Sequence, residues 1–197
     1  MSPEDGTPGH GESKTADRAR SGDPEVPAQR RRSLMRRWGY ELIIVVAVFA
    51  GLQAWMSRGA ASGAAPPLSG FSLDGEALGL VSNPDRPVLV HFWATWCGIC
   101  KFMDGNIANV AADHPVITVA LSSGGVEPVS SHLRDRDLQM PVLLDDSGEI
   151  GRRWGVRGVP TSFLIDTNGQ IRNVTVGFTT ELGLRARLLW LRYFGAA

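Results

Sequence analysis

Apolar residues in this chain occur as one long run near the N-terminus and as several short runs after residue 70. The long run covers residues 38–56 and approaches the ~20 residues that cross a bilayer as a helix. The short runs alternate between strand-like and helix-like spacing, which predicts an α/β domain around a mostly central sheet. Strands are predicted at 71–73, 78–80, 88–93, 116–121, 141–145, 161–166 and 170–176, and helices at 97–112, 129–136, 149–154 and 180–193.

Two of these predicted helices have apolar residues spaced to face the sheet. They are Phe102, Met103, Ile107 and Val110 in the first helix, and Leu184, Leu188, Leu189 and Leu191 in the last.

The chain is predicted to consist of four parts. Residues 1–37 are rich in Gly, Pro, Ser and charged residues, so they cannot bury enough surface to offset chain entropy and are expected to be disordered. Residues 38–56 are expected to form a transmembrane helix and residues 57–69 a flexible tether. Residues 70–197 are long enough for one globular domain.

The flanks of the 38–56 run are those of a membrane anchor. Trp38 and Tyr40 at one end and Trp55 at the other fit the aromatic belts of the two interfaces. The positive-inside rule places the N-terminus in the cytoplasm and the domain in the periplasm, because arginines crowd the N-terminal side of the run and only Arg58 follows it closely. The anchor would then lie in the inner membrane. Two alternatives remain for this run. One is a buried core helix. The other is a cleaved signal peptide, although the region before the run is long for a signal peptide.

Cys97 and Cys100, the two cysteines of the chain, form a Cys-Gly-Ile-Cys segment just after the predicted strand 88–93. A strand that delivers such a pair to the first turn of a helix is typical of a redox site. The unpaired N–H groups and partial positive charge at a helix N-terminus favour a thiolate over a thiol. Cys97 is then the nucleophile. Cys100, about one turn further on, is expected beneath it, within disulfide distance and less open to solvent.

Other roles for the pair fit the sequence less well. A structural disulfide that closes so small a loop would constrain the unfolded chain very little. A metal site needs more ligands, and only His91 and His114 are near the pair in sequence. Covalent haem attachment requires a histidine at the position of Lys101. The sequence therefore predicts no metal and no organic cofactor.

Residues 93–100 (Trp-Ala-Thr-Trp-Cys-Gly-Ile-Cys) and 158–161 (Gly-Val-Pro-Thr) resemble the two signature segments of the thioredoxin superfamily. The resemblance covers most of residues 70–193 and implies a thioredoxin-like fold, with a central mixed sheet flanked by helices. It also implies that Pro160 is in the cis form and packs against the Cys pair. The main chain of Val159 would then pair with an extended segment of the substrate.

Within the superfamily, the anchor and the additional helix and strand between Leu121 and Asp145 resemble the TlpA-like, ResA-like and CcmG-like periplasmic thiol-disulfide oxidoreductases. That likeness connects the chain with cytochrome c biogenesis. Segments 119–124, 154–161 and 177–185 resemble the suppressor-for-copper-sensitivity protein D group, which connects it with copper tolerance.

His91 and Trp96 are further candidate site residues. His91 stands where thioredoxin-like proteins often hold a buried carboxylate that handles the proton of the inner cysteine. A neutral imidazole could do the same, and a core histidine with satisfied hydrogen bonds is the alternative. Trp96 is expected to be a partly exposed wall that contacts a partner protein, whereas Trp93, Trp154 and Trp190 are expected to be structural.

These features predict a membrane-tethered enzyme that exchanges disulfides with partner proteins. Cys97 would attack a partner's disulfide and Cys100 would resolve the mixed disulfide. Because an oxidising compartment tends to leave the pair as a disulfide, a reductase role requires an electron donor, and a membrane thiol transporter is expected. Apocytochrome cysteines, a copper-handling protein or another oxidoreductase would be the substrates.

Two hypotheses of another class remain open. In the first, the chain is a copper-binding module in which the Cys pair and His91 or His114 hold Cu(I), an ion that soft thiolates suit. In the second, it is a redox-inert adaptor that does not need Cys97. Nucleic-acid binding is not expected, since 20 Lys and Arg residues balance 20 Asp and Glu residues.

Overall fold

The computed structural model describes residues 28–80 and 86–195, with only the main chain for residues 28–37. The chain divides after Val46 into two units. Helix α1, Ala28–Met56, begins in the first unit and ends in the second. Within the described residues, its part from Trp38 to Met56 is the one helix long and apolar enough to cross a membrane, with a mean hydropathy of 1.6.

Helix α1 begins at Ala28, ten residues before the apolar run, whereas residues 28–37 are expected from the sequence to be disordered. No Gly or Pro stands between Ala28 and Trp38, and most residues there are Arg, Gln, Leu or Met, which favour helix. The rest of the segment expected to be disordered, residues 1–27, lies outside the described residues.

The second unit contains eight strands and four further helices within the described residues. In chain order they are β1 (Gly63–Ala64), β2 (Ser69–Phe71), β3 (Ala77–Gly79), β4 (Val88–Trp93), α2 (Gly98–Ala111), β5 (Val116–Leu121), α3 (Val126–Asp135), β6 (Val142–Asp145), α4 (Glu149–Arg153), β7 (Thr161–Ile165), β8 (Gln170–Val176) and α5 (Glu181–Phe194).

Six of these strands form one mixed sheet in the order β1-β8-β7-β4-β5-β6. Strands β4, β5 and β6 run parallel, while β4 with β7, β7 with β8, and β8 with β1 pair antiparallel. Strand β4 lies between β5 and β7, and all six of its residues are buried. Its β-branched and aromatic residues suit a strand that is covered on both faces. The predicted α/β architecture is confirmed.

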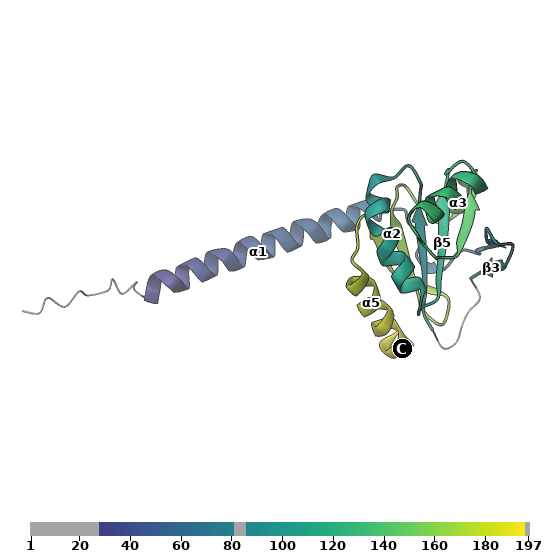
Figure 1. Cartoon of the computed structure of the whole chain (residues 1–197). Coiled ribbons are helices and arrows are strands. Elements are labelled where there is room, and N and C mark those ends of the chain that lie inside the picture. The colour runs from purple at the N-terminus through teal and green to yellow at the C-terminus, as the bar shows by residue number, and fades with distance from the viewer. Residues whose placement is uncertain (1–27, 81–85, 196–197) are drawn as a thin grey trace, which may run out of the picture. The chain divides into compact units, whose positions relative to one another are not determined.

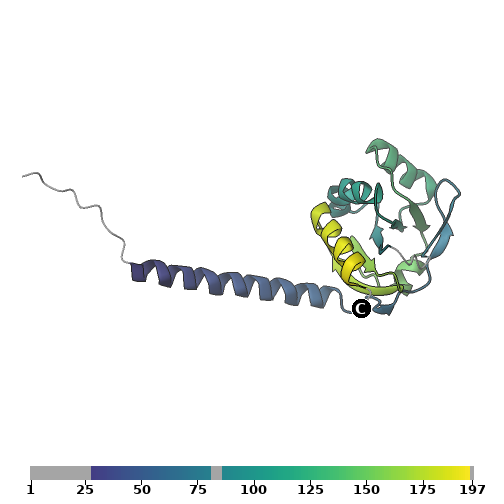
Figure 2. The ribbon, with the colours of Figure 1, turned by 90° about the horizontal axis from the view of Figure 1, so that it is seen from below.

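Helices α2, α3 and α5 cover one face of this sheet. Helices α2 and α5 pack on the face that contains Leu89 and Leu164, and they lie side by side in Figures 1 and 2. Helix α3 packs on the same face against Trp93, through Val129 and His132. On the opposite face, an aromatic cluster of Phe92, Trp154 and Phe163 forms the centre of the core.

Part of the predicted tether belongs to the folded domain. Gly63 and Ala64 form β1 at the edge of the sheet, and the Ala61 N–H donates to the Trp154 carbonyl at 2.9 Å. Leu68 is buried in the core beside Leu143. The expectation of a flexible tether up to residue 69 is therefore wrong for this segment. Strand pairing uses main-chain groups and needs no large side chain. The small residues of β1 therefore show no apolar pattern that would predict a strand.

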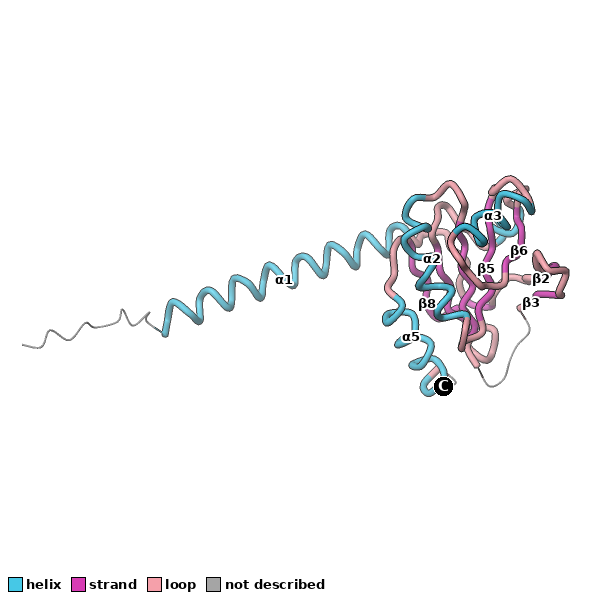
Figure 3. The backbone as a smooth tube through the Cα atoms, in the orientation of Figure 1, coloured by secondary structure: helices cyan, strands magenta, loops and turns pink. Residues whose placement is uncertain are grey.

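Two predicted hairpins are present, with small shifts at their ends. The first is β2 and β3, whose strands begin earlier than the predicted 71–73 and 78–80, and which Figure 3 shows beside β6. The second is β7 and β8, joined across Asn168-Gly169, where Gly169 adopts the positive φ of 73° that glycine tolerates. Helix α3 also begins earlier than the predicted residue 129.

Three helical side chains point away from the core, contrary to expectation. Phe102 on α2 is 81% exposed, because the buried stripe of that helix contains Cys100, Met103 and Ile107 instead. Trp190 is 61% exposed and Leu189 is also exposed, because Leu184, Leu188 and Leu191 occupy the buried side of α5. The structural role expected for Trp190 is therefore wrong.

A buried carboxylate connects α2 with α3. Asp104 is only 2% exposed; it is hydrogen-bonded to His132 Nε2 at 2.8 Å and forms an ion pair with Arg136, whose Nε lies 3.1 Å from the carboxylate. The His132 ring also packs on Trp93, with 5.1 Å between ring centroids. Because its partners come from the end of α3, Asp104 fixes the position of the helix that begins at the Cys pair.

Replacement of Asp104 by Ala is expected to lower the free energy of unfolding by about 2 kcal/mol, since it leaves the nearly buried His132 imidazole without its hydrogen-bond partner and removes the ion pair with the more exposed Arg136. Urea unfolding of the full chain in detergent, followed by tryptophan fluorescence, measures the loss. The matched control is Glu127→Ala, which removes an exposed partner of Arg134 and is expected to cost less than about 1 kcal/mol. Equal losses in the two variants would contradict the role given to Asp104.

Candidate active site

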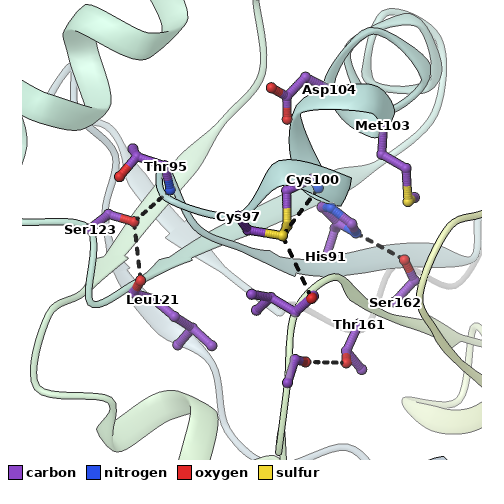
Figure 4. Close-up of a disulfide and its surroundings, with 12 residues drawn as sticks. His91, Thr95, Cys97, Cys100, Met103, Asp104, Leu121, Ser123, Thr161 and Ser162 are labelled. Atoms are coloured by element: carbon purple, nitrogen blue, oxygen red, sulfur yellow. Dashed lines mark hydrogen bonds between the residues drawn. A yellow bond between two sulfur atoms is a disulfide. The ribbon is translucent and has the colours of Figure 1, made fainter.

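Cys97 and Cys100 form a disulfide at the start of α2, with 5.3 Å between their Cα atoms. Cys97 is the N-cap residue of the helix, and its Sγ accepts the N–H of Cys100 at 3.1 Å. Figure 4 shows this sulfur between the first turn of α2 and the loop that precedes β7. The predicted placement of the pair, after a buried strand and at a helix N-terminus, is thus observed. A thiolate at this position would be stabilised by the free N–H groups and the helix dipole.

The two sulfurs differ in their access to solvent. Cys97 is 8% exposed and Cys100 is 1% exposed. Gly98 and Ile99, which separate them, are exposed. Cys97 is therefore the more accessible of the two sulfurs, while Cys100 lies beneath the surface.

The loop before β7 approaches the disulfide from the side. The peptide bond between Val159 and Pro160 is cis, as the resemblance implies. Cys97 Sγ lies 3.6 Å from the carbonyl oxygen of Val159. Pro160 is buried, and the Thr161 hydroxyl donates to the Gly158 carbonyl at 2.7 Å, which closes the turn. Pro160 has no N–H, so this side of the sulfurs presents an apolar surface.

Trp96 forms an exposed wall next to Cys97. Its side chain is 64% exposed, while its Nε1–H donates to the Ser122 carbonyl at 3.0 Å. The Thr95 N–H donates to Ser123 Oγ at 3.2 Å, and Ser123 Oγ in turn donates to the Leu121 carbonyl at 3.1 Å. The segment 95–96 is therefore held by the loop that follows β5 (Figure 4).

His91 is buried on β4 and is joined to Ser162 of β7 by a hydrogen bond of 2.9 Å between Nδ1 and Oγ. The two residues are register partners in the sheet (Figure 4). Burial lowers the pKa of His91 from 6.5 to about 3, so the imidazole is neutral at physiological pH. The hydrogen bond to Ser162 agrees with the interpretation of His91 as a core histidine. The neutral ring also agrees with the interpretation in which His91 handles a proton.

Sequence reasoning missed several residues that support the site. Three of them are serines that contact the site through hydrogen bonds to residues far away in the sequence: Ser122, Ser123 and Ser162. Asp104 carried a usable signal, because it follows Cys100 by one turn and precedes Ile107 by nearly one turn, on the buried stripe of α2.

The ligand set of the copper hypothesis is not assembled among residues 28–80 and 86–195, where no group of three or more His, Cys, Asp and Glu residues could hold a metal ion. His91 is bonded to Ser162, and His114 Nδ1 lies 2.9 Å from the carboxylate of Asp113.

Comparison with known proteins places this geometry in context. Residues 60–186 match the family model described as Redoxin. The chain is 34% identical over 125 residues to a thioredoxin-like protein of Haemophilus influenzae, a match that covers 62% of this chain and 74% of that protein. It is 26% identical over 156 residues to sporulation thiol-disulfide oxidoreductase A of Bacillus subtilis, covering 73% of this chain and 94% of that protein.

The domain is also similar to a solved structure. The crystal structure of StoA from Bacillus subtilis superimposes with a TM-score of 0.53 at 25% identity, covering 61% of this chain and 95% of that one. The thioredoxin-like fold expected from the sequence is thereby confirmed, and with it the enzymatic class. This chain belongs to the Redoxin family, and it is a thiol-disulfide oxidoreductase.

Proposed function

We propose that this chain is a membrane-anchored reductase of protein disulfides, with Cys97 as nucleophile and Cys100 as resolving cysteine. The observation that supports this most directly is the position of Cys97 Sγ, which accepts an N–H of the first turn of α2 and lies 3.6 Å from the Val159 carbonyl oxygen. The sulfur thus combines a helix N-terminus, which stabilises a thiolate, with a neighbouring main-chain segment that can hold a substrate.

The exchange proceeds in two steps. In the reduced enzyme, the Cys97 thiolate attacks one sulfur of a partner's disulfide, forms a mixed disulfide and releases the other sulfur as a thiolate. Cys100 then loses its proton and attacks Cys97 Sγ, which forms the enzyme disulfide and releases the second thiol of the partner. Two electrons pass from the Cys pair to the partner. A dithiol electron donor must return them, and a membrane thiol transporter is the proposed source.

Substrate binding is assigned to Trp96, Val159 and Pro160. The exposed Trp96 ring provides an apolar wall on one side of Cys97, and its Nε1–H bond to Ser122 restrains the ring. On the other side, an extended segment of the partner could pair with the main chain of Val159, which leads into β7. A folded or flexible protein segment fits such an open site.

His91 is assigned the handling of the Cys100 proton. Its neutral imidazole lies on β4, the strand that leads into the Cys pair, and its link to Ser162 fixes the ring. A neutral imidazole can take up a proton as the inner thiol ionises, and because burial lowers the pKa of His91, the ring would pass that proton on rather than keep it.

The proposed localisation is the inner membrane, crossed once by residues 38–56. The span carries aromatic residues near both ends, and arginines precede it, which supports a cytoplasmic N-terminus and a periplasmic domain. In this arrangement residues 1–37 form the cytoplasmic tail, and the free tether is shorter than predicted, since β1 begins at Gly63. Membership of the suppressor-for-copper-sensitivity protein D group is proposed on segments 119–124, 154–161 and 177–185.

The order of attack is tested with two variants. Cys100→Ser is expected to accumulate a mixed disulfide with a labelled peptide disulfide, because the resolving thiol is absent, whereas Cys97→Ser is expected to accumulate none. Non-reducing electrophoresis and mass spectrometry of the full chain identify the adduct. If Cys97→Ser captures the peptide and Cys100→Ser does not, the two assignments must be exchanged. Capture by neither variant would contradict the proposed mechanism.

The direction of electron flow is tested by the equilibrium reduction potential of the full chain. A reductase is expected near −270 mV, roughly the value of thioredoxin, and an oxidant nearer to about −120 mV. Free thiols at Cys97 and Cys100 are counted across a series of thiol-disulfide buffers. A value at the oxidising end would exclude the reductase direction while leaving the exchange chemistry intact.

The environment of His91 predicts a pH dependence of stability. The unfolded chain binds a proton at this residue near pH 6.5, whereas the folded chain does so only near pH 3. The free energy of unfolding should therefore fall as the pH drops below 6.5, by at most about 1.4 kcal/mol per unit, with no contribution above it. Urea unfolding between pH 7 and pH 5 should show a flatter dependence in His91→Gln. An unchanged slope would show that the imidazole protonates equally in both states.

A further inference from the structure

The last helix of the domain is apolar on two opposite sides. Leu184, Leu188 and Leu191 form its buried stripe, which packs against α2 and the sheet. The opposite side of a surface helix normally carries polar residues. In α5 that side carries exposed large apolar residues instead, and we call it the outer face: Leu182, Leu189, Trp190, Tyr193 and Phe194.

Aromatic residues gather at the C-terminal end of this outer face. Trp190 and Phe194 stack with 4.5 Å between their ring centroids, and Tyr193 is 70% exposed. Trp and Tyr combine a large apolar ring with one polar atom, and both are enriched where a membrane meets water. Exposed aromatic rings so close together mark a surface that contacts something apolar.

Arginines border the outer face on both sides. At 3.6 residues per turn, Arg187 falls next to Phe194 on one border and Arg192 falls next to Leu189 on the other. Neither arginine forms an ion pair within the part of the chain that the structure describes, and both are exposed. The single acid of α5, Glu181, is already bound by Arg185 at 2.8 Å. The outer face is thus apolar with positively charged borders.

We propose that the outer face of α5 lies on the membrane surface, with its aromatic rings at the level of the headgroups and with Arg187 and Arg192 on anionic lipids. This inference rests on the proposed anchoring by residues 38–56. An apolar face with cationic borders is the composition of helices that lie in the plane of a bilayer. Arginine can keep its charge at the headgroups while its stem covers apolar surface.

Two observations favour lipid over a second protein as the occupant. The first is charge complementarity, since a bilayer with anionic lipids offers apolar and negative groups together along the whole length of the helix. The second is proximity. Residues 57–62 alone separate the end of α1 from β1, and such a segment reaches at most about 20 Å when extended. An anchored domain is therefore held near lipid whatever its partners do.

Contact at α5 would orient the active site, because α5 is tied to the helix that carries the Cys pair. Asn109 of α2 donates to Glu181 at 2.9 Å, and Arg185 donates to the Asn109 carbonyl at 2.9 Å. Met103 and Ile107 of α2 pack in the same core cluster as the buried stripe of α5. A membrane-bound outer face would thus present Cys97 at a fixed height above the bilayer, which suits partners that are themselves membrane proteins.

The test is a site-specific photo-cross-link in the full chain, reconstituted into vesicles of phosphatidylcholine and phosphatidylglycerol. Benzoylphenylalanine replaces Tyr193, and the matched control places it at Phe71, an equally exposed aromatic residue on β2. Mass spectrometry should find lipid adducts at position 193 in several-fold excess over position 71. Arg187→Gln and Arg192→Gln should each lower the adduct yield, by about fivefold per arginine at most.

Other outcomes would overturn the proposal. Adducts with a second copy or with α1 of the same chain would identify a protein occupant, and a yield at 193 no higher than at 71 would mean that the face meets water. Extraction of the vesicles with alkaline carbonate tests the membrane anchor separately from the lipid contact at α5. Release of the chain would overturn the anchor and this inference together, whereas a retained chain without lipid adducts would overturn this inference alone.

Discussion

Burial of β4 on both faces is the constraint on which the rest of the structure depends. All six residues of the strand are buried, and its neighbours β5 and β7 hold it by main-chain hydrogen bonds. A shift of one residue would exchange the two faces, turning Phe92 out of its aromatic cluster and His91 away from Ser162. The end of the strand is therefore fixed, and so is the first turn of α2, where both sulfurs lie.

Two loops around the first turn of α2 determine what can reach Cys97. The loop after β5 holds Thr95 and Trp96 through Ser122 and Ser123. The loop before β7 brings the Val159 carbonyl to the sulfur. Each loop follows or precedes a strand paired in the same sheet, so the site is rigid although its walls come from distant parts of the sequence. Such a site is preorganised to hold a partner's disulfide in line with one sulfur.

The sequence could predict those parts of the fold that local patterns encode. The buried strand before the Cys pair, the hairpin across Asn168-Gly169 and the proline beside the sulfurs each have a short signal of residue type and spacing. Features that depend on distant partners were not predictable. Nothing near Asp104 indicates that His132 would meet it, and the small residues of β1 carry no apolar pattern. The structural role expected for Trp190 is wrong because α5 carries apolar residues on two sides, and helical spacing does not tell which side packs against the domain.

The pairing of β1 has a consequence for the behaviour of the domain at high concentration. A strand at the edge of a sheet exposes unpaired N–H and C=O groups, which can pair with the edge of another molecule. Gly63 and Ala64 occupy that edge opposite Ile171 and Gln170, so the chain covers the start of its own β8 with a segment of its own. The stretch that leads into the domain thereby guards against edge-to-edge aggregation. A truncation that removed it would expose the start of β8 to intermolecular strand addition.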